Sequence, residues 1–210
     1  MDIREVRHIL KHSREKSPRE VKKYAVLIPM IPGAEGVEIL FEVRSSALRR
    51  QPGEICFPGG GVHFGENPER AAVRETSEEL LIEEGQIEVL SGMRESSIYS
   101  GGVLYPYIGQ ISNYRETFSE EEVAEVFRVP LDWFINNPPD IYGVRTQEHP
   151  GNDFPYDRIP DGENYHWGSR KRQIRFYQYG DRTIWGLTAG IVSQFVDRLK
   201  NPEWDAGSEE

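Results

Sequence analysis

Three glutamates near the middle of the chain are spaced so that a helix would bring their side chains together. Glu75 and Glu79 are four residues apart, and Glu75 and Glu78 are three apart, which places all three within about 100° of the helix circumference. Like charges at this spacing destabilise a helix by about 0.2–0.5 kcal/mol per pair, and no Lys or Arg offsets them between Glu75 and Met93. A solvated acidic face is one interpretation. A bound divalent cation is the better one, because Mg²⁺ takes carboxylates, waters and substrate phosphates as ligands.

A group of glycines precedes this stretch, at Gly59, Gly60, Gly61 and Gly65. Glycine lets the backbone approach a ligand closely and exposes amide groups that can bind phosphate. A glycine-rich loop by itself is typical of a turn. Next to an acidic helix, it favours a site for Mg²⁺ and a diphosphate.

The glycines and the glutamates belong to one motif. Gly60 is followed after five residues by Glu66, and after seven more by Arg-Glu-Thr-Ser-Glu-Glu at residues 74–79. This pattern resembles the Nudix box of the Nudix hydrolases. The resemblance implies cleavage of a nucleoside diphosphate linked to another group. It also implies a fold in which the box forms a loop, a helix and a second loop.

The same resemblance implies roles for individual residues. By this match Glu75, Glu78 and Glu79 are ligands of Mg²⁺ or Mn²⁺, or one of them is the base that activates water. Arg74 would orient these carboxylates, and Glu66 would hold the loop or join the metal shell.

Nudix enzymes often use a further carboxylate from outside the box. Glu122, at the start of a strand-like segment, is the candidate here, and a solvated loop residue is the alternative.

Two positions depart from the box. Thr76 replaces an aliphatic residue, and Leu81 stands where the box has glycine. The next glycine is Gly85, so the helix is expected to continue for a further turn. The three central carboxylates are not affected.

The loop before the box carries a second motif. With three residues between successive groups, it contains Arg44-Ser45, Arg49, Gly53 and Phe57-Pro58-Gly59-Gly60. This spacing resembles the motif that marks coenzyme A diphosphatases within the Nudix hydrolases. Segments further along the chain extend the resemblance over residues 24–199.

The second motif implies coenzyme A or a derivative as substrate, with 3′,5′-ADP and 4′-phosphopantetheine as products. Coenzyme A carries a diphosphate and a separate ribose phosphate, and arginine can bind phosphate in a bidentate manner. The expected substrate-binding residues are Arg44, Arg49, Phe57, Gly59 and Gly60. Arg50 is equally compatible with a surface position, and Phe57 with the core.

Two alternative functions remain open. One keeps the chemistry but takes ADP-ribose or another nucleoside diphosphate derivative, and the coenzyme A motif argues against it. The other is a nucleotide-sensing domain without turnover. Leu81 supports the second alternative, and the intact set of carboxylates argues against it.

The elements that must position these residues are those of an α+β domain. Residues 24–31 and 37–43 predict a β-hairpin, and Asn67 with Pro68 suits the start of a helix. Further strands are expected at 87–90, 103–111 and 123–129 and from 174, with a last helix at 184–199. With the resemblance, this predicts the Nudix fold, a mixed β-sheet sandwiched between helices.

Three segments follow from this organisation. They are an N-terminal helical extension at 1–23, a Nudix hydrolase domain at 24–200 and an acidic tail at 201–210. Residues 137–172 lack periodicity but are rich in aromatic side chains, which favours an ordered loop that covers the ligand.

Composition limits the classes of partner. The 210 residues carry a formal net charge of −10, which argues against binding nucleic acid or a membrane surface. The single cysteine excludes an internal disulfide and a cysteine-built zinc site. No apolar run approaches the roughly 20 residues of a membrane span, and residues 1–6 lack the apolar core of a signal peptide. A cytoplasmic protein with a small-molecule substrate is expected, and a homodimer is left open.

Overall fold

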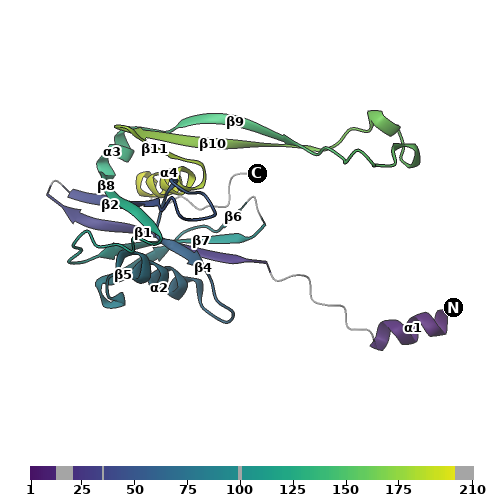
Figure 1. Cartoon of the computed structure of the whole chain (residues 1–210), viewed down its shortest axis with the longest axis horizontal. Helices are drawn as coiled ribbons and strands as arrows, with labels where there is room; N and C mark the ends of the chain where they lie inside the picture. The colour runs from purple at the N-terminus through teal and green to yellow at the C-terminus, as the bar shows by residue number, and fades with distance from the viewer. Residues whose placement is uncertain (13–20, 35, 99–100, 202–210) are drawn as a thin grey trace.

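A mixed sheet of eight strands forms the centre of the computed structural model, which describes residues 1–12, 21–34, 36–98 and 101–201 (Figure 1). β1 pairs in parallel with β7, and the other pairings are antiparallel. The strands are β1 Lys23–Gly33, β2 Gly36–Arg44, β3 Ile55–Cys56, β4 Gly59–Gly61, β5 Ile87–Gly92, β6 Ser96–Ser97, β7 Val103–Ile111 and β8 Val123–Pro130. The antiparallel pairing of β1 with β2 confirms the predicted hairpin.

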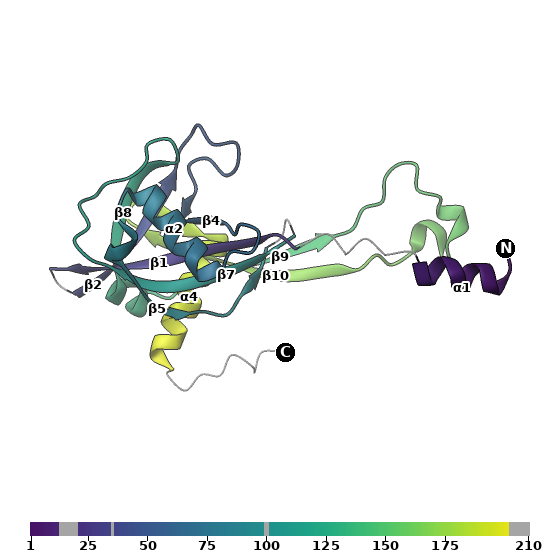
Figure 2. The ribbon, with the colours of Figure 1, turned by 90° about the horizontal axis from the view of Figure 1, so that it is seen from below.

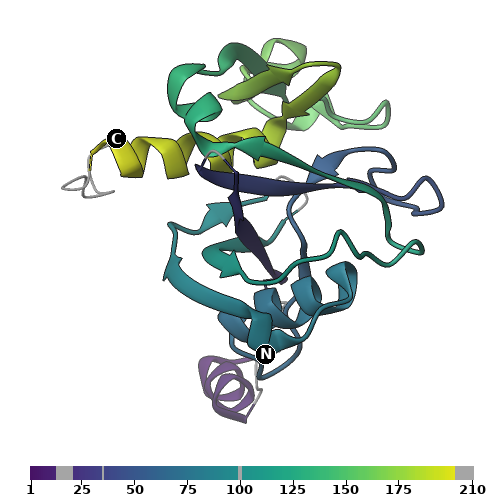
Figure 3. The ribbon, with the colours of Figure 1, turned by 90° about the vertical axis from the view of Figure 1, so that its left-hand side faces the viewer.

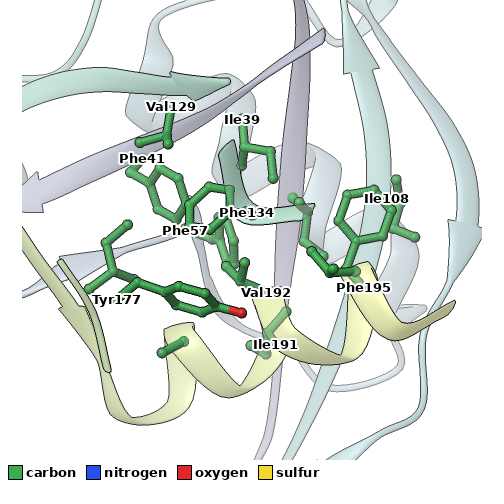
Figure 4. Close-up of a cluster of buried hydrophobic side chains, with 14 of the residues drawn as sticks. Ile39, Phe41, Phe57, Ile108, Val129, Phe134, Tyr177, Ile191, Val192 and Phe195 are labelled. Carbon is green, nitrogen blue, oxygen red and sulfur yellow. The ribbon is translucent and has the colours of Figure 1, made fainter. Parts of the chain in front are cut away.

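β1 is buried on both of its faces, as its continuous apolar run predicts. On one face Ala25 packs against Ala71 and Ala72 of helix α2 (Pro68–Leu80). On the other, Ile28 joins a core that includes Val192 and Phe195 of helix α4 (Gly186–Lys200), shown in Figure 4. The two helices therefore lie on opposite sides of the sheet (Figure 3), which confirms the predicted α+β layering.

A second, antiparallel sheet takes up both ends of the loop that was predicted at residues 137–172, and residues 148–168 remain outside its strands. After α3 (Leu131–Asn136) it contains β9 (Asp140–Gln147), β10 (Ser169–Tyr179) and β11 (Arg182–Trp185), in the order β11-β10-β9. Between β9 and β10 lie two short 3₁₀ helices, η2 (Tyr156–Arg158) and η3 (Gly162–Asn164). The far half of this hairpin extends from the body as an arm (Figure 2). The prediction missed β9 because this strand is mostly exposed, with only Val144 and Thr146 half-buried, so its sequence has no clear apolar alternation.

The start of the last helix also differs from the prediction. Ile184 belongs to β11, where it pairs with Tyr177, and α4 begins at Gly186. Ile184 is fully buried, so its apolar character reflects a strand packed in the core and not a helix face.

The predicted N-terminal extension contains helix α1 (Ile3–His12), none of whose residues is buried. Residues 13–20 of this extension lie outside the described residues, as does the acidic tail beyond Asn201. No helix in the described part of the chain is long and apolar enough to cross a bilayer.

Helix α2 begins as predicted and ends earlier than predicted. The Asn67 side chain accepts a hydrogen bond from the Glu69 backbone at 2.9 Å, and Pro68 occupies the first turn. The helix stops at Leu80 because Leu81 takes the left-handed conformation, with φ +52°. The Thr117 hydroxyl then donates to the Leu80 carbonyl at 2.6 Å, which replaces a helical partner. The extra turn toward Gly85 is therefore not formed.

The strain at Leu81 leads to a stability prediction. The left-handed conformation costs a non-glycine residue about 1–2 kcal/mol, and the Leu81 side chain is 60% exposed. We expect the Leu81→Gly variant to have a free energy of unfolding about 0.5–1 kcal/mol higher than that of Leu81→Ala. The difference is smaller than the strain that is relieved, because glycine loses more conformational entropy on folding than alanine does. Urea denaturation of the two variants measures this difference. Both variants lack the leucine side chain, so the effect of its removal cancels in the comparison. A glycine variant less stable than the alanine variant would contradict the assignment of strain.

Candidate active site

Two glycines bring the chain before α2 into close contact with the sheet and with the helix. Gly59 has φ +152°, and a Cβ atom there would lie 2.3 Å from the Ala25 carbonyl oxygen. A Cβ atom on Gly60 would lie 2.5 Å from the carboxylate carbon of Glu75. Position 59 therefore requires glycine, and Gly60 leaves the space that the Glu75 carboxylate occupies.

Arg74 ties the glycine-rich loop to the helix. Its guanidinium donates to both oxygens of Glu66, at 3.0 and 3.1 Å, to Glu75 at 2.9 Å and to the Gly61 carbonyl at 3.2 Å. Glu66 also accepts a hydrogen bond from the backbone of His63 at 2.8 Å. Because of the Arg74 hydrogen bonds and the His63 bond, the pKa of Glu66 falls to about 2. The loop and the helix are thus held as one unit.

Glu79 is the most buried of the three box glutamates, with 4% of its surface exposed. Its carboxylate accepts a hydrogen bond of 2.7 Å from the backbone N–H of Gly59. Burial raises the pKa of Glu79 well above its usual range, the Gly59 bond opposes that rise, and the charges of Glu122 and Glu75 add to it. Glu78, by contrast, is exposed and meets Arg74 at 3.4 Å.

Glu122 is brought to the end of α2 by hydrogen bonds along the preceding loop. The backbone N–H of Ser119 donates to the Glu79 carbonyl at 2.7 Å, and that of Glu122 donates to the Ser119 carbonyl at 3.1 Å. The Glu122 carbonyl in turn accepts from Ser45 at 2.8 Å. Glu122 thereby lines the same cavity as Glu75 and Glu79.

A further carboxylate near Glu79 escaped the sequence analysis. Glu42 on β2 is only 1% exposed, and burial together with the Glu79 charge raises its pKa well above the usual range. Its Oε1 atom has no hydrogen-bond partner among the described residues. The strand pattern gave no signal, because alternation with Phe41 and Val43 places Glu42 on what reads as a polar face.

The carboxylates fit a hard divalent cation by their chemistry. Within the described residues, no group of three or more His, Cys, Asp or Glu side chains is already gathered around one metal position. Arg74 holds Glu75 and Glu78, and Glu79 accepts the Gly59 hydrogen bond. All the donors are carboxylate oxygens, and the unpartnered Oε1 of buried Glu42 is the kind of atom that a cation satisfies. The assignment of Glu75, Glu78 and Glu79 as metal ligands stays a prediction.

A cavity of about 1280 Å³ extends from these carboxylates. Five basic side chains line it, namely Lys22, Arg44, Arg50, Arg172 and Arg175. Arg50 lines the cavity, whereas the predicted Arg49 does not do so in the described part of the chain. Arg172 and Arg175 were missed because they lie on β10, in and next to the segment that was predicted as a loop.

Phe57 packs into the core. Its ring stacks on that of Phe41 with centroids 5.0 Å apart, as Figure 4 shows, and it is buried. Phe57 is therefore a core residue, as one of the two sequence interpretations has it, and it also lines the cavity, so its contact with substrate stays a prediction.

The fit between Gly60 and Glu75 makes a sharp prediction. A Gly60→Ala variant is expected to lose at least about 10-fold in kcat/KM, because the new methyl group displaces the Glu75 carboxylate and 1 Å displacements can cost about 100-fold. Gly61→Ala is the matched control, since a Cβ atom there meets nothing within 4 Å. Steady-state kinetics and thermal unfolding of both variants test this. Equal activities of the two variants would contradict it.

Comparisons with known proteins agree with this geometry. Residues 21–148 match the family model of the NUDIX domain. The mouse peroxisomal coenzyme A diphosphatase NUDT7 is 34% identical over 134 residues, which cover 63% of this chain and 56% of that protein. The match thus spans less than two thirds of the mouse protein.

Two further comparisons cover more of the chain. The uncharacterized Nudix hydrolase NudL of Enterobacter sp. (strain 638) is 30% identical over 192 residues, or 87% of each chain. The crystal structure of a MutT/nudix family protein from Enterococcus faecalis matches with a TM-score of 0.53 and 15% identity, and covers 95% of this chain and 70% of that one. This structural likeness confirms the predicted fold.

Proposed function

Since the chain belongs to the Nudix hydrolase family, we propose that it hydrolyses the diphosphate of coenzyme A or of a coenzyme A derivative. The products would be 3′,5′-ADP and 4′-phosphopantetheine, and Mg²⁺ or Mn²⁺ would be the cofactor. The observation that carries this proposal is the cavity in which carboxylates and five basic side chains meet.

The basic side chains suit a substrate with more than one phosphate group. Arg44 ends β2, Arg50 lies in the loop that follows it, and Arg172 and Arg175 lie on β10, so they approach the cavity from different elements. Arginine binds phosphate through a planar fork of donors. In a chain with a net charge of −10, this concentration of positive charge is local and supports binding of a ribose phosphate in addition to a diphosphate.

The acidic end of the cavity supplies the hydrolytic groups. A divalent cation bound there would neutralise the diphosphate and lower the pKa of a bound water. Glu75, Glu78 and Glu79 would hold the cation, and one of them or Glu122 would take the proton of the attacking water. Arg74 would act as a positioning residue through its hydrogen bonds to the box glutamates.

The basic end would bind and orient the substrate. Arg44 would bind its phosphates, and water would attack phosphorus directly, so no covalent enzyme intermediate is expected. Gly59 and Gly60 would let the diphosphate approach the backbone.

The relatives support this substrate class. The mouse protein that matches is named as a coenzyme A diphosphatase, and the second motif of this chain resembles the same subgroup. The cytoplasmic location stays a prediction, and the mouse relative is named as a peroxisomal protein. Dimerisation stays an open prediction.

The test is a substrate comparison with purified full-length protein and Mg²⁺. Coenzyme A, 3′-dephospho-coenzyme A, ADP-ribose and dinucleoside polyphosphates are incubated in parallel, and the products are resolved by chromatography. We expect 3′,5′-ADP from coenzyme A, and a kcat/KM for coenzyme A about 10-fold or more above that for the 3′-dephospho form, as hydrogen bonds to a charged group predict.

Other outcomes would contradict the proposal. Cleavage of ADP-ribose without cleavage of coenzyme A would assign the chain to the alternative substrate class. Tight binding of a nucleotide without cleavage of any substrate would favour the sensing alternative.

A further inference from the structure

Trp185 is a large aromatic residue in the cavity wall to which the proposed reaction gives no task. In the described part of the chain, the aromatic residues that line the cavity are Tyr24, Phe57 and Trp185. Phe57 is buried and Tyr24 is half-buried, whereas 40% of the Trp185 surface is exposed. Trp185 is therefore the aromatic side chain of this wall that a bound ligand can cover.

The backbone fixes the position of Trp185. It is the last residue of β11 and pairs with Phe176 on β10, and Gly186, with φ +66°, then turns the chain into α4. In the first turn of α4 the Thr188 hydroxyl donates to the Ile55 carbonyl at 3.1 Å, which ties the start of the helix to β3. The indole is therefore carried by a strand end that is anchored to both sheets.

The indole of Trp185 is already part of an aromatic stack. The rings of Trp185 and Phe176 are nearly parallel, with 15° between their planes and 5.8 Å between their centroids. Trp185 also borders two hollows, because it lines both the cavity of about 1280 Å³ and a neighbouring one of about 450 Å³. A planar group that enters the cavity can thus extend the stack over the exposed part of the ring.

The charges on β10 indicate which planar group this is. Arg172 and Arg175 line the cavity on the strand that pairs with β11. Arg172 precedes Phe176 by four residues, so its side chain leaves the same face of the strand about 13 Å away. In coenzyme A the separate phosphate is attached to the ribose that bears adenine, and the pantetheine half carries none. An aromatic surface beside these two arginines therefore fits the nucleotide half of the substrate.

We propose that the exposed face of Trp185 is the platform on which the adenine of the substrate stacks, with Arg172 and Arg175 facing the ribose phosphate of the same nucleotide. The choice of adenine rests on the proposed function, since a coenzyme A substrate brings the base and this phosphate together. Aromatic stacking recognises the flat surface of a base. Because the base lies away from the bond that breaks, it contributes equally to binding of the substrate and of the transition state.

Binding of the two halves of coenzyme A tests the proposal. 3′,5′-ADP and 4′-phosphopantetheine lack the diphosphate, so neither is cleaved. Isothermal titration calorimetry in Mg²⁺ measures their dissociation constants with the full-length wild type, Trp185→Leu and Trp185→Tyr. We expect Trp185→Leu to weaken binding of 3′,5′-ADP about 10-fold, as loss of a base stack does, and to leave 4′-phosphopantetheine unchanged. Trp185→Tyr keeps an aromatic face and should restore most of the affinity.

Steady-state kinetics with coenzyme A provides a second readout. In Trp185→Leu, KM should rise by about the same 10-fold factor while kcat stays at the wild-type value, as loss of uniform binding predicts. Circular dichroism and thermal unfolding confirm that each variant folds. Should Trp185→Leu fail to fold, Trp185→Met provides a second apolar side chain without a ring.

Tyr142→Leu is the matched control on the same sheet. Tyr142 on β9 is 58% exposed, and its ring meets that of Phe176 edge-on, with centroids 5.5 Å apart. It does not line the cavity within the described residues, so loss of its ring should change neither dissociation constant.

The outcomes separate the platform from the proposed function. A folded Trp185→Leu variant that binds 3′,5′-ADP as tightly as the wild type, or that weakens 4′-phosphopantetheine instead, would overturn the platform and leave hydrolysis of coenzyme A intact. A wild-type protein that binds no 3′,5′-ADP would also overturn the platform. Binding of 3′,5′-ADP that depends on Trp185, without cleavage of coenzyme A, would support the platform and overturn the proposed function.

Discussion

A Glu79→Gln variant is expected to lose catalysis while its metal-free form becomes more stable than the wild type. Glu79 is 4% exposed and faces the charges of Glu122, Glu75 and Glu42. Glutamine removes one of these charges and keeps an oxygen that can accept the Gly59 hydrogen bond. We expect kcat to fall by more than about 100-fold, since loss of a metal ligand should exceed the roughly 10–100-fold effect of losing a supporting residue.

The gain in stability should depend on pH. Burial raises the pKa of Glu79 in the folded protein above the unfolded value of 4.5, so ionisation of Glu79 weakens folding as the pH rises above 4.5. Below that pH both forms are protonated, and Gln and Glu should then be equivalent. At pH 8 the variant is expected to be more stable by about 1–3 kcal/mol. Urea unfolding in EDTA at pH 5 and pH 8, with kinetics in Mg²⁺, measures both effects.

Glu69→Gln is the control for this prediction. Glu69 lies on the same helix but is exposed and does not line the cavity among the described residues, so its replacement should change neither kcat nor the pH dependence of stability. Full activity of Glu79→Gln would refute its role as a metal ligand. A variant that is less stable than the wild type at pH 8 would contradict the electrostatic argument.

The helix that carries the box was predictable because its signals are local. Asn67 and Pro68 define its start through contacts within a few residues, and the spacing of Glu75 and Glu79 determines that they share a face. Its end was not predictable in the same way. Leu81 adopts a conformation that its side chain disfavours, and the compensating bond to the last turn comes from Thr117, which lies 37 residues from the Leu80 carbonyl that accepts it.

The burial of Glu42 could not be predicted because it depends on tertiary contacts. In sequence, positions 37, 39, 41 and 43 are apolar, which predicts one buried face and leaves Glu38, Leu40 and Glu42 on the other, more polar face. Only the pairing of β2 with β3 and β8, and the position of α2 above them, shows that the polar face is covered at Glu42. Local alternation reports which face a side chain is on, but not what packs against that face.

The basic wall of the cavity was missed for a related reason. β9 and β10 pair with each other over eight register positions, so their stability comes largely from the hydrogen bonds of the hairpin. Arg172 lies in the part of β10 that shows no clear apolar period, and Arg175 lies at the start of the predicted last strand, where nothing local indicates that it faces a cavity. Their place beside Arg44 and Arg50 follows from the second sheet, which packs on α4 and which no local motif indicates.

An Arg74→Lys variant is expected to lose about 100-fold in kcat with little change in KM. Arg74 is 21% exposed and uses its planar fork to hold both oxygens of Glu66 while it also contacts Glu75, Glu78 and the Gly61 carbonyl. Lysine keeps the charge but offers a single point of contact, so it cannot hold loop and helix together. A displacement of about 1 Å in the reacting groups costs about 100-fold in rate. KM should stay constant because Arg74 does not line the cavity in the described part of the chain.

Arg70→Lys is the matched control on the same helix. Arg70 is 76% exposed and approaches Glu84 no closer than 3.9 Å, so its replacement should leave both kcat and KM within about 2-fold of the wild type. Steady-state kinetics with coenzyme A over a range of concentrations separates the two parameters. If Arg74→Lys raised KM and left kcat unchanged, Arg74 would contact the substrate directly. The network of hydrogen bonds predicts the opposite, since the partners that the guanidinium has among the described residues belong to the box helix or to the loop before it.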